Sequence, residues 1–152
     1  MLGSEPTASS GSREENYVSG SSAVSPKSDL QGLKILVIDD SKTIRRTAET
    51  LLAKEGCEVY TAVDGFDALS KIADNRTDII FVDIMMPRLD GYQTCSLIKH
   101  NKVFKDTPVI MLSSKDGLFD RARGRLVGSE QYLTKPFTKD ELLSAIHSHV
   151  AK

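Results

Sequence analysis

Three aspartates and one lysine stand directly after short apolar runs of this sequence. Asp39 and Asp40 follow LKILVI, Asp83 follows DIIFV, and Lys135 follows YLT. Carboxylates gathered at one place repel one another unless a cation lies between them, and an all-oxygen ligand set suits Mg²⁺. An aspartate carboxylate is also a known acceptor of phosphoryl groups. These residues therefore indicate magnesium-dependent transfer of a phosphoryl group to a carboxylate.

A hydroxyl and a balance of charge support the same chemistry. One Mg²⁺ and the Lys135 ammonium together neutralise three carboxylates. A phosphoryl group on Asp83 would add a charge of roughly −2, and donors would be needed to hold its oxygens. Ser113 follows the apolar run PVIML and offers such a donor, with Ser114 beside it as a rival.

Alternating strands and helices are needed to bring these positions together. Short runs of branched apolar residues predict buried strands at residues 33–38, 57–62, 78–82, 109–112 and 132–134. Helical patterns predict helices at residues 43–55, from Asp64 onward, and at 92–100, 117–127 and 138–150. Right-handed crossovers then build a parallel α/β sheet that helices cover on both faces. The carboxyl ends of its strands meet at one edge, where ligands bind.

Local signals fix some helix ends and faces. Asp64 with Asp67, and Thr138 with Glu141, predict N-terminal caps. The stripes expected to face the core are Ile44, Ala48, Leu51 and Leu52; Phe66, Leu69 and Ile72; and Leu142, Ile146 and Val150. The helix at 117–127 has few apolar residues and contains Gly124, so its stability should be marginal.

Composition limits the class of protein. The chain has 152 residues, 39% of them apolar, which is enough for one domain with one core. A net charge of −1 provides no positive field for nucleic acid or an anionic membrane. No apolar run is long enough to span a membrane, and no secretory signal pattern begins the chain. A cytoplasmic protein without nucleic-acid binding or membrane insertion is expected.

Residues 1–31 differ in composition from residues 32–152. They are rich in serine and glycine, with few large apolar side chains and more acids than bases. Such a segment cannot bury enough surface to offset its chain entropy. We therefore expect a disordered N-terminal tail at 1–31 and one domain at 32–152.

The cysteines and histidines do not suggest a metal site. Cys57 and Cys95 are far apart in the sequence, and the histidines are His100, His147 and His149. A structural zinc site needs four well-spaced ligands. We expect buried thiols and solvent-facing histidines instead.

Four motifs together resemble one known family. The runs LVIDDSKTIRR, FVDIMMPRLDGYQ, PVIMLSS and QYLTKPFT resemble, in order and spacing, the receiver domains of two-component response regulators. The resemblance covers residues 33 to 150 and is closest to stand-alone receivers of type IV pilus chemosensory systems. It implies a flavodoxin-like (βα)5 fold, a doubly wound sheet with strand order 2-1-3-4-5.

The resemblance also implies a role for each site residue. Asp83 would be phosphorylated, and Mg²⁺ would be bound by Asp39, Asp40, Asp83 and the backbone carbonyl of Met85, with Asp40 as a direct ligand. The Met85 side chain would lie over the path of attacking water. Ser113 and Lys135 would contact the phosphoryl group, Ser113 and Tyr132 would act as switch residues, and a cis bond would join Lys135 to Pro136.

The implied partners are proteins. A histidine kinase of a chemosensory type would phosphorylate Asp83, and the phosphorylated form would bind a target that controls twitching motility or a related response. The chain would be a phosphoacceptor and not an enzyme, apart from its own phosphorylation and dephosphorylation. The target would bind the surface made by the helix at 117–127, the strand at 132–134 and the last helix. Arg121, Arg123 and Arg125 lie there, with Arg88 and Lys115 elsewhere on the rim, although such a basic run is equally typical of a solvated face.

Three other functions fit parts of the pattern. A dehalogenase-like phosphatase also uses Asp and Mg²⁺ but needs a DxD pair, whereas Ile84-Met85 follows Asp83. A flavodoxin-type binder needs a phosphate loop after the first strand, where Asp39-Asp40 would repel phosphate. An adaptor that keeps the fold but works without phosphorylation is harder to exclude, and the complete set of acidic residues argues against it.

Overall fold

The computed structural model describes residues 30–114 and 120–150. Backbone contacts divide the chain into Met1–Gln31 and Gly32–Lys152, and the elements below belong to the second unit. Its strands are β1 (Lys34–Ile38), β2 (Glu58–Ala62), β3 (Ile79–Asp83), β4 (Val109–Ser114) and β5 (Gln131–Lys135). Its helices are α2 (Lys42–Ala53), α3 (Gly65–Asp74), α4 (Gly91–Lys99), α5 (Arg121–Val127) and α6 (Lys139–His149).

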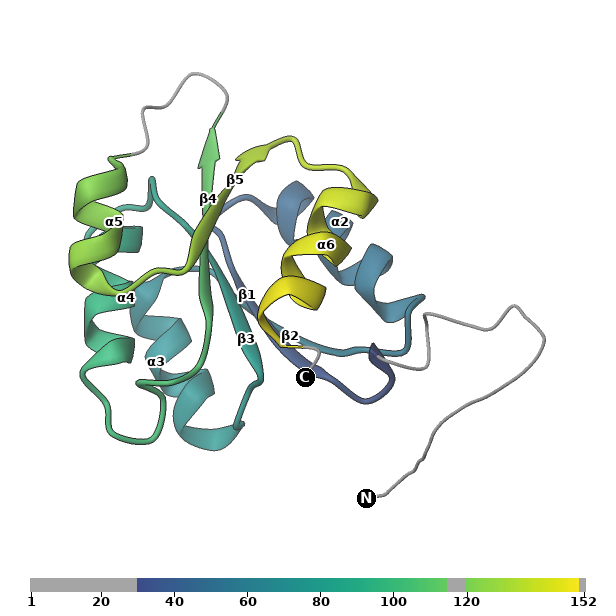
Figure 1. The fold of residues 1–152 in the computed structure, drawn as a ribbon, viewed down its shortest axis with the longest axis horizontal. Coiled ribbons are helices and arrows are strands. Elements are labelled where there is room, and N and C mark those ends of the chain that lie inside the picture. The colour runs from purple at the N-terminus through teal and green to yellow at the C-terminus, as the bar shows by residue number, and fades with distance from the viewer. Residues whose placement is uncertain (1–29, 115–119, 151–152) are drawn as a thin grey trace. The chain divides into compact units, whose positions relative to one another are not determined.

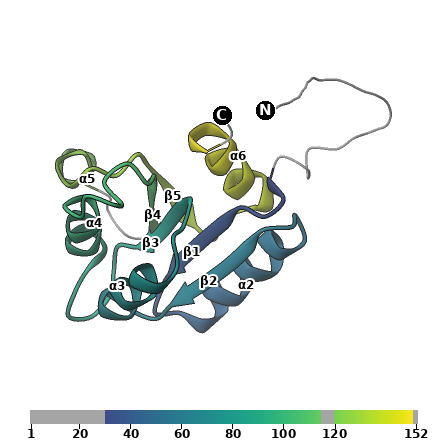
Figure 2. The same ribbon diagram turned by 90° about the horizontal axis from the view of Figure 1, so that it is seen from below.

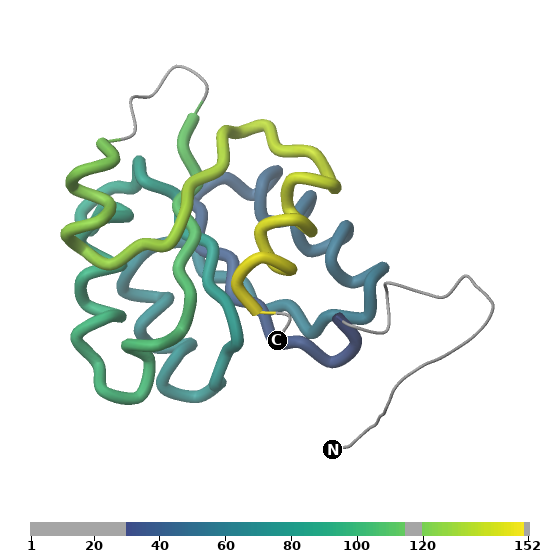
Figure 3. The backbone as a smooth tube through the Cα atoms, in the orientation of Figure 1, coloured from purple at the N-terminus to yellow at the C-terminus, as the bar shows by residue number. Residues whose placement is uncertain are grey.

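The five strands of the described residues form one parallel sheet in the order β2-β1-β3-β4-β5. After each strand the chain returns through a helix before it enters the next strand, a path that can be followed in Figure 3. The flavodoxin-like (βα)5 fold and its strand order are therefore confirmed.

Helices cover both faces of this sheet. α2 and α6 lie on one face, and α3, α4 and α5 lie on the other (Figures 1 and 2). All five residues of β3 are buried, and β1 and β4 each have one residue that is not. Burial on both faces explains why these strands are nearly continuous apolar runs instead of alternating patterns.

Strand register brings the polar positions to one edge. Ile38 of β1 is paired with Val82 of β3, so Asp39 and Asp83 follow at the same level. Ser113 is paired with Thr134, one residue before Lys135. This edge is the one toward which the arrowheads of β4 and β5 point in Figure 1.

The predicted helix caps are present. The Asp67 amide donates to Asp64 Oδ1 at 2.8 Å, and Thr138 and Glu141 form a capping box. A second capping box, between Asp90 and Gln93, starts α4 at Gly91 and was not predicted.

Some predicted boundaries and faces were wrong. Strands β3, β4 and β5 extend to Asp83, Ser114 and Lys135, so the site residues Asp83, Ser113 and Lys135 lie within strands and not after them. α5 begins at Arg121, and residues 117–119 of its predicted range lie outside the described residues. Phe66 was expected on the core face of α3, but it is 53% exposed. The Arg88 guanidinium lies over the Phe66 ring, 5.0 Å from its centroid, so the ring packs against this side chain instead of the core.

The thiols behave as predicted, and the histidines do so only in part. Cys57 and Cys95 are buried, and burial raises the pKa of Cys57 to about 11 and that of Cys95 to about 12. His100 is exposed, whereas His147 and His149 are half-buried. His149 Nε2 lies 2.8 Å from Gln131 Oε1.

Two observations concern the rest of the chain. Within residues 30–114 and 120–150, none of the helices has the length and apolar character that crossing a bilayer requires. Leu30, which composition assigned to the tail, is 1% exposed.

Candidate functional site

Three carboxylates meet at the carboxyl edge of the sheet. Asp39, Asp40 and Asp83 each place an oxygen within 4.8 Å of the others. Asp39 and Asp83 are buried, whereas Asp40 is exposed. The cluster is therefore open to solvent on the side of Asp40, where an ion or a small anion could enter.

Lys135 neutralises the buried half of this cluster. Its Nζ lies 3.1 Å from Asp39 Oδ2 and 3.1 Å from Asp83 Oδ1. Burial lowers the pKa of Lys135, but the charges of Asp39 and Asp83 outweigh it, and the net pKa is raised. Lys135 therefore keeps its positive charge in the folded domain. Its peptide bond to Pro136 is cis, as predicted.

The Asp83 carboxyl group is strongly affected by its surroundings. Burial and the charge of Asp39 raise its pKa to about 6, although Lys135 and the Met85 amide act in the opposite direction. That amide donates to Asp83 Oδ1 at 3.3 Å. The site without a cation therefore holds more negative charge than its single lysine can stabilise.

Asp39 is fixed by the residues that start α2. The Ser41 amide donates to Asp39 Oδ1 at 2.8 Å, and Arg45 Nη1 donates to the Asp39 backbone carbonyl at 2.6 Å. Ser41 is also the N-cap of α2. The same turn thus begins the helix and orients the carboxylate. Ser41 and Arg45 were not predicted as site residues.

Ser113 and Met85, two further residues predicted for the site, differ in exposure. Ser113 is 5% exposed, and its hydroxyl donates to the Ser114 carbonyl at 3.3 Å. Met85 is 69% exposed, and its predicted place over the path of attacking water stays a prediction.

The comparisons with known proteins agree with this geometry. The family model described as the response regulator receiver domain matches residues 35–147. This chain belongs to the response regulator receiver family. A receiver domain is a signalling protein and not a conventional enzyme, so the phosphatase and flavodoxin-type alternatives, which the sequence already disfavoured, do not apply.

Two relatives illustrate how far the sequence similarity of this receiver extends. It is 78% identical over 119 residues to Protein PilG of Pseudomonas aeruginosa, and the matched region covers 78% of this chain and 88% of PilG. It is 37% identical over 116 residues to response regulator MprA of a Mycobacterium species, and the matched region covers 76% of this chain and 50% of MprA.

Solved receiver structures have the same fold. Chemotaxis protein CheY4 of Vibrio cholerae matches with a TM-score of 0.74 at 32% identity, over 78% of this chain and 99% of CheY4. The receiver domain of Francisella response regulator 1452 matches with a TM-score of 0.68 at 38% identity, over 77% of this chain and 95% of that chain.

Tyr132 lies outside the acidic cluster of the receiver. It is half-buried in β5, and its hydroxyl accepts a hydrogen bond from Arg121 Nη2 at 3.0 Å. The Arg121 guanidinium also lies 5.6 Å from the centroid of its ring. Tyr132 therefore connects the sheet to α5 and does not contact the carboxylates through these interactions.

Three of the arginines that the sequence singled out, Arg88, Arg121 and Arg123, have contacts within the receiver. Arg123 lies over the ring of Tyr92, 4.4 Å from its centroid. Arg88 Nη2 is 2.6 Å from Asp64 Oδ2. Arg125 lines a surface hollow with Arg121 and Tyr132, and Lys115 lies outside the described residues. Arg121 and Arg123 are thus engaged with aromatic side chains although they are exposed, and the role of this surface in partner binding stays a prediction.

Two residues near the site were missed. Gly91 packs against the backbone of Asp83, and the Tyr92 hydroxyl accepts from the Asp120 amide. The motif DGY was visible, but its contacts depend on how α4 and α5 pack.

Proposed function

We propose that this receiver binds Mg²⁺ and accepts a phosphoryl group on Asp83 from a histidine kinase. The observation that carries the proposal is the cluster of three carboxylates within 4.8 Å, two of them ion-paired to Lys135. A structural ion-pair network does not need Asp40, an exposed carboxylate beside the buried pair. A cation site does need it.

The donor set suits magnesium. Asp39, Asp40, Asp83 and the Met85 backbone carbonyl would hold the ion, and all four offer oxygen, which Mg²⁺ prefers over softer donors. The bound ion would stabilise negative charge on the oxygens of the incoming phosphoryl group. The raised pKa of Asp83 indicates that the residues alone do not fully compensate that carboxylate.

The transfer itself uses residues of the chain. A carboxylate oxygen of Asp83 attacks phosphorus, a P–O bond forms, and the P–N bond of the kinase phosphohistidine breaks with its electron pair going to the imidazole. The Lys135 ammonium, already 3.1 Å from Asp83 Oδ1, would pair with a phosphoryl oxygen. The Ser113 hydroxyl would donate to another. Hydrolysis of the acyl phosphate would reset the site.

The signalling system is proposed from sequence similarity. With 78% identity to PilG, the most direct proposal is a stand-alone regulator of type IV pilus twitching motility or a related chemosensory response. The kinase would then be of the chemosensory type, the output would be binding to a protein target, and both steps would occur in the cytoplasm.

Ser113 and Tyr132 are proposed as the switch. Shifting the domain from about 1% to about 99% active requires roughly 5.5 kcal/mol, whereas one charge-assisted hydrogen bond supplies about 1.5 to 3 kcal/mol. Ser113 therefore shares this work with Lys135 and with repacking around α5. Tyr132 would have to rearrange its contact with Arg121 to turn inward. Ser113→Ala should keep phosphorylation but lower phosphate-enhanced target affinity by about 10- to 100-fold.

The test is incubation with acetyl phosphate and Mg²⁺, followed by intact mass measurement. We expect one added phosphoryl group on the wild type, none on Asp83→Asn, and strongly reduced uptake for Asp40→Ala. Asp106→Asn is the matched control, because Asp106 is an exposed aspartate just before β4, at the opposite edge of the sheet. Chelation of Mg²⁺ should abolish uptake in every variant.

Two results would contradict the proposal. Phosphoryl uptake by Asp83→Asn equal to the wild type would show that another residue is the acceptor. No uptake by the wild type, combined with target binding unaffected by Asp83→Asn, would identify a phosphorylation-independent adaptor instead.

A further inference from the structure

The first turn of α4 lies directly against the backbone of Asp83. A Cβ atom at Gly91 would be 2.5 Å from the Asp83 carbonyl oxygen and 2.7 Å from the Ile84 Cα. The Gly91 amide donates to the Ile84 carbonyl at 2.9 Å. No residue larger than glycine fits at this close contact. A displacement of the end of β3 would therefore push directly on α4, because no space separates the two.

Tyr92, the next residue, connects α4 to α5. Its side chain is 5% exposed, and its hydroxyl accepts a hydrogen bond from the Asp120 amide at 2.9 Å. Asp120 is the N-cap of α5, and its carboxylate accepts from the Arg123 amide at 3.0 Å. One hydroxyl on α4 thus holds the residue that starts α5.

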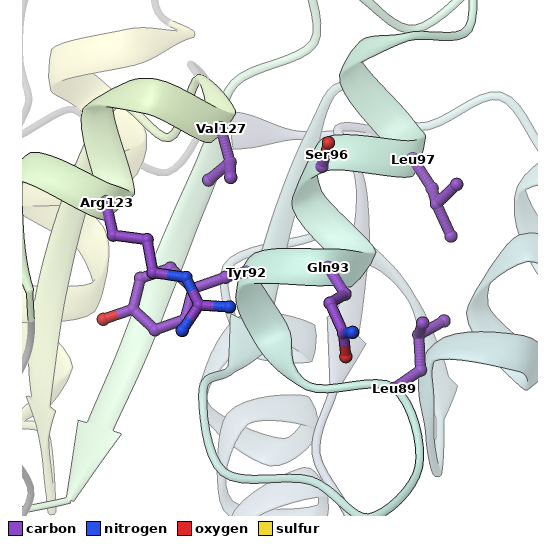
Figure 4. Close-up of a pocket in the computed structure, with 7 residues that line it drawn as sticks. All are labelled: Leu89, Tyr92, Gln93, Ser96, Leu97, Arg123 and Val127. Atoms are coloured by element: carbon purple, nitrogen blue, oxygen red, sulfur yellow. The ribbon is translucent and has the colours of Figure 1, made fainter.

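Arg123 makes the reciprocal contact from α5 to α4. Its guanidinium lies over the Tyr92 ring, as Figure 4 shows. The distance from the guanidinium carbon to the ring centroid is 4.4 Å. Its Nη2 is also 3.7 Å from Asp90 Oδ2, and Asp90 is the N-cap of α4. Each helix therefore contacts the capping residue of the other.

α5 depends on such contacts because it is weak as a helix. It has seven residues and contains Gly124. A helix of this length is marginal in isolation, and an interior glycine costs about 1 kcal/mol more than alanine. The position of α5 is therefore set by its packing partners more than by its own backbone.

The stack of Arg123 on Tyr92 also shapes the surface. Both residues line two hollows. The first is completed by Leu89, Gln93, Ser96, Leu97 and Val127 (Figure 4). The second is completed by Ile84, Met85, Met86, Pro87 and Asp90. A displacement of the stack would change both hollows at once, which a protein partner could detect.

Resting on the proposed phosphorylation of Asp83, we propose that Tyr92 is a positioning residue that couples the state of Asp83 to α5. The route runs from the Asp83 backbone through Gly91 to Tyr92, and then to Asp120 and Arg123. It starts from β3 and reaches the beginning of α5. It is therefore separate from the switch at Ser113 and Tyr132, which starts from a hydroxyl on β4.

The test compares hydrogen exchange of the α5 amides with and without beryllofluoride and Mg²⁺, used as the phosphoryl mimic. Tyr92→Phe removes the hydroxyl and keeps the ring. Tyr60→Phe is the matched control, because the Tyr60 hydroxyl also makes a hydrogen bond, to Glu58 Oε2 at 2.8 Å, on the edge strand β2. Phosphorylation by acetyl phosphate is measured in parallel by intact mass.

In the wild type and Tyr60→Phe, we expect beryllofluoride to change α5 exchange. In Tyr92→Phe that change should shrink roughly two- to tenfold, as the loss of one hydrogen bond predicts, while phosphoryl uptake stays at the wild-type level. A merely structural role would alter α5 exchange equally in both states and leave the difference intact. That result would overturn the coupling.

Two further outcomes separate this inference from the proposed function. A wild type that takes up phosphoryl while its α5 exchange does not respond overturns the coupling alone. A wild type that takes up none overturns the proposed function and the coupling together. Arg123→Lys, which keeps the positive charge but removes the planar group from the Tyr92 ring, should give a change between those of the wild type and Tyr92→Phe.

Discussion

The acidic pocket and the surface between α4 and α5 hold their charges in opposite ways. In the pocket, Asp39 and Asp83 are buried at the ends of central strands, and Lys135 lies between them. On the surface, Arg121 and Arg123 are exposed on a seven-residue helix and are held by aromatic rings and polar groups. The pocket concentrates charge in the core, and the surface distributes it at the periphery.

This difference in burial suits the two regions to different roles. Buried charges interact strongly, and losing one partner leaves the other without compensation. Exposed cation–π and ion pairs contribute little individually and can rearrange at low cost. Under the proposed function, the group that is positioned for transfer lies in the first region, and the surface proposed to change shape on phosphorylation lies in the second. Substitutions in the two regions should differ in size and in their dependence on magnesium and pH.

Lys135→Met should have the largest effect on stability. It removes the cation paired with Asp39 and Asp83 and leaves two buried carboxylates together. We expect a loss of roughly 3 kcal/mol in the free energy of unfolding with chelator present, measured by urea denaturation. Added Mg²⁺ should restore part of it. A variant as stable as the wild type in chelator would show that the pocket charges are already compensated by solvent.

Asp83→Asn should stabilise the metal-free domain. The folded-state pKa of about 6 exceeds the ordinary value of 3.8, so the protonated carboxyl contributes stability that is present below pH 4 and lost as the pH rises through 6. The asparagine of the variant does not titrate, so its free energy of unfolding does not fall in this way. At pH 8 it should exceed that of the wild type by about 1 to 3 kcal/mol. Its advantage should shrink below pH 6. Asp106→Asn should show no such pH dependence, and a constant difference between pH 4 and 8 would contradict the assignment.

Arg121→Met should have a small effect on folding. It removes one hydrogen bond and one ring contact with Tyr132 at an exposed position. We expect the melting temperature to change by at most about 2 °C, independent of Mg²⁺. Arg125→Met, in the same hollow, is the control. A large decrease in melting temperature for Arg121→Met alone would show that the contact between Arg121 and Tyr132 is important for the stability of the fold.

Deletion of residues 1–29 should have no effect on folding or phosphoryl uptake. We propose from composition that the N-terminal segment packs no core. The cut is placed before Leu30 because that side chain is buried. A decrease in melting temperature of about 4 °C or more would show that the deleted residues bind the domain.

The sequence predicted the pocket well because parallel topology does most of the positioning. Once Asp83 is assigned to the end of a buried strand, the strand order places it beside Asp39 and at the same end of the sheet as Lys135, which is two strands away. No side-chain packing has to be known for that conclusion. The errors concerned strand ends, where pairing with a neighbour carries β4 on to Ser114.

Side-chain contacts on the surface could not be predicted in the same way. The position of Phe66 depends on Arg88, whose backbone has a φ of 67° and whose side chain returns to α3. The pairing of Arg123 with Tyr92 depends on the distance between two helices. Neither is encoded in periodicity, because both result from packing between elements distant in the chain.

The burial of both cysteines has a practical consequence for following this domain in solution. With pKa values of about 11 and 12, Cys57 and Cys95 are thiolate at pH 7 in only about one molecule in ten thousand or fewer. Maleimide reagents should therefore react slowly with the native fold. A single cysteine introduced at Leu126, which is 85% exposed on α5, could then carry a fluorophore or spin label without prior removal of the native thiols.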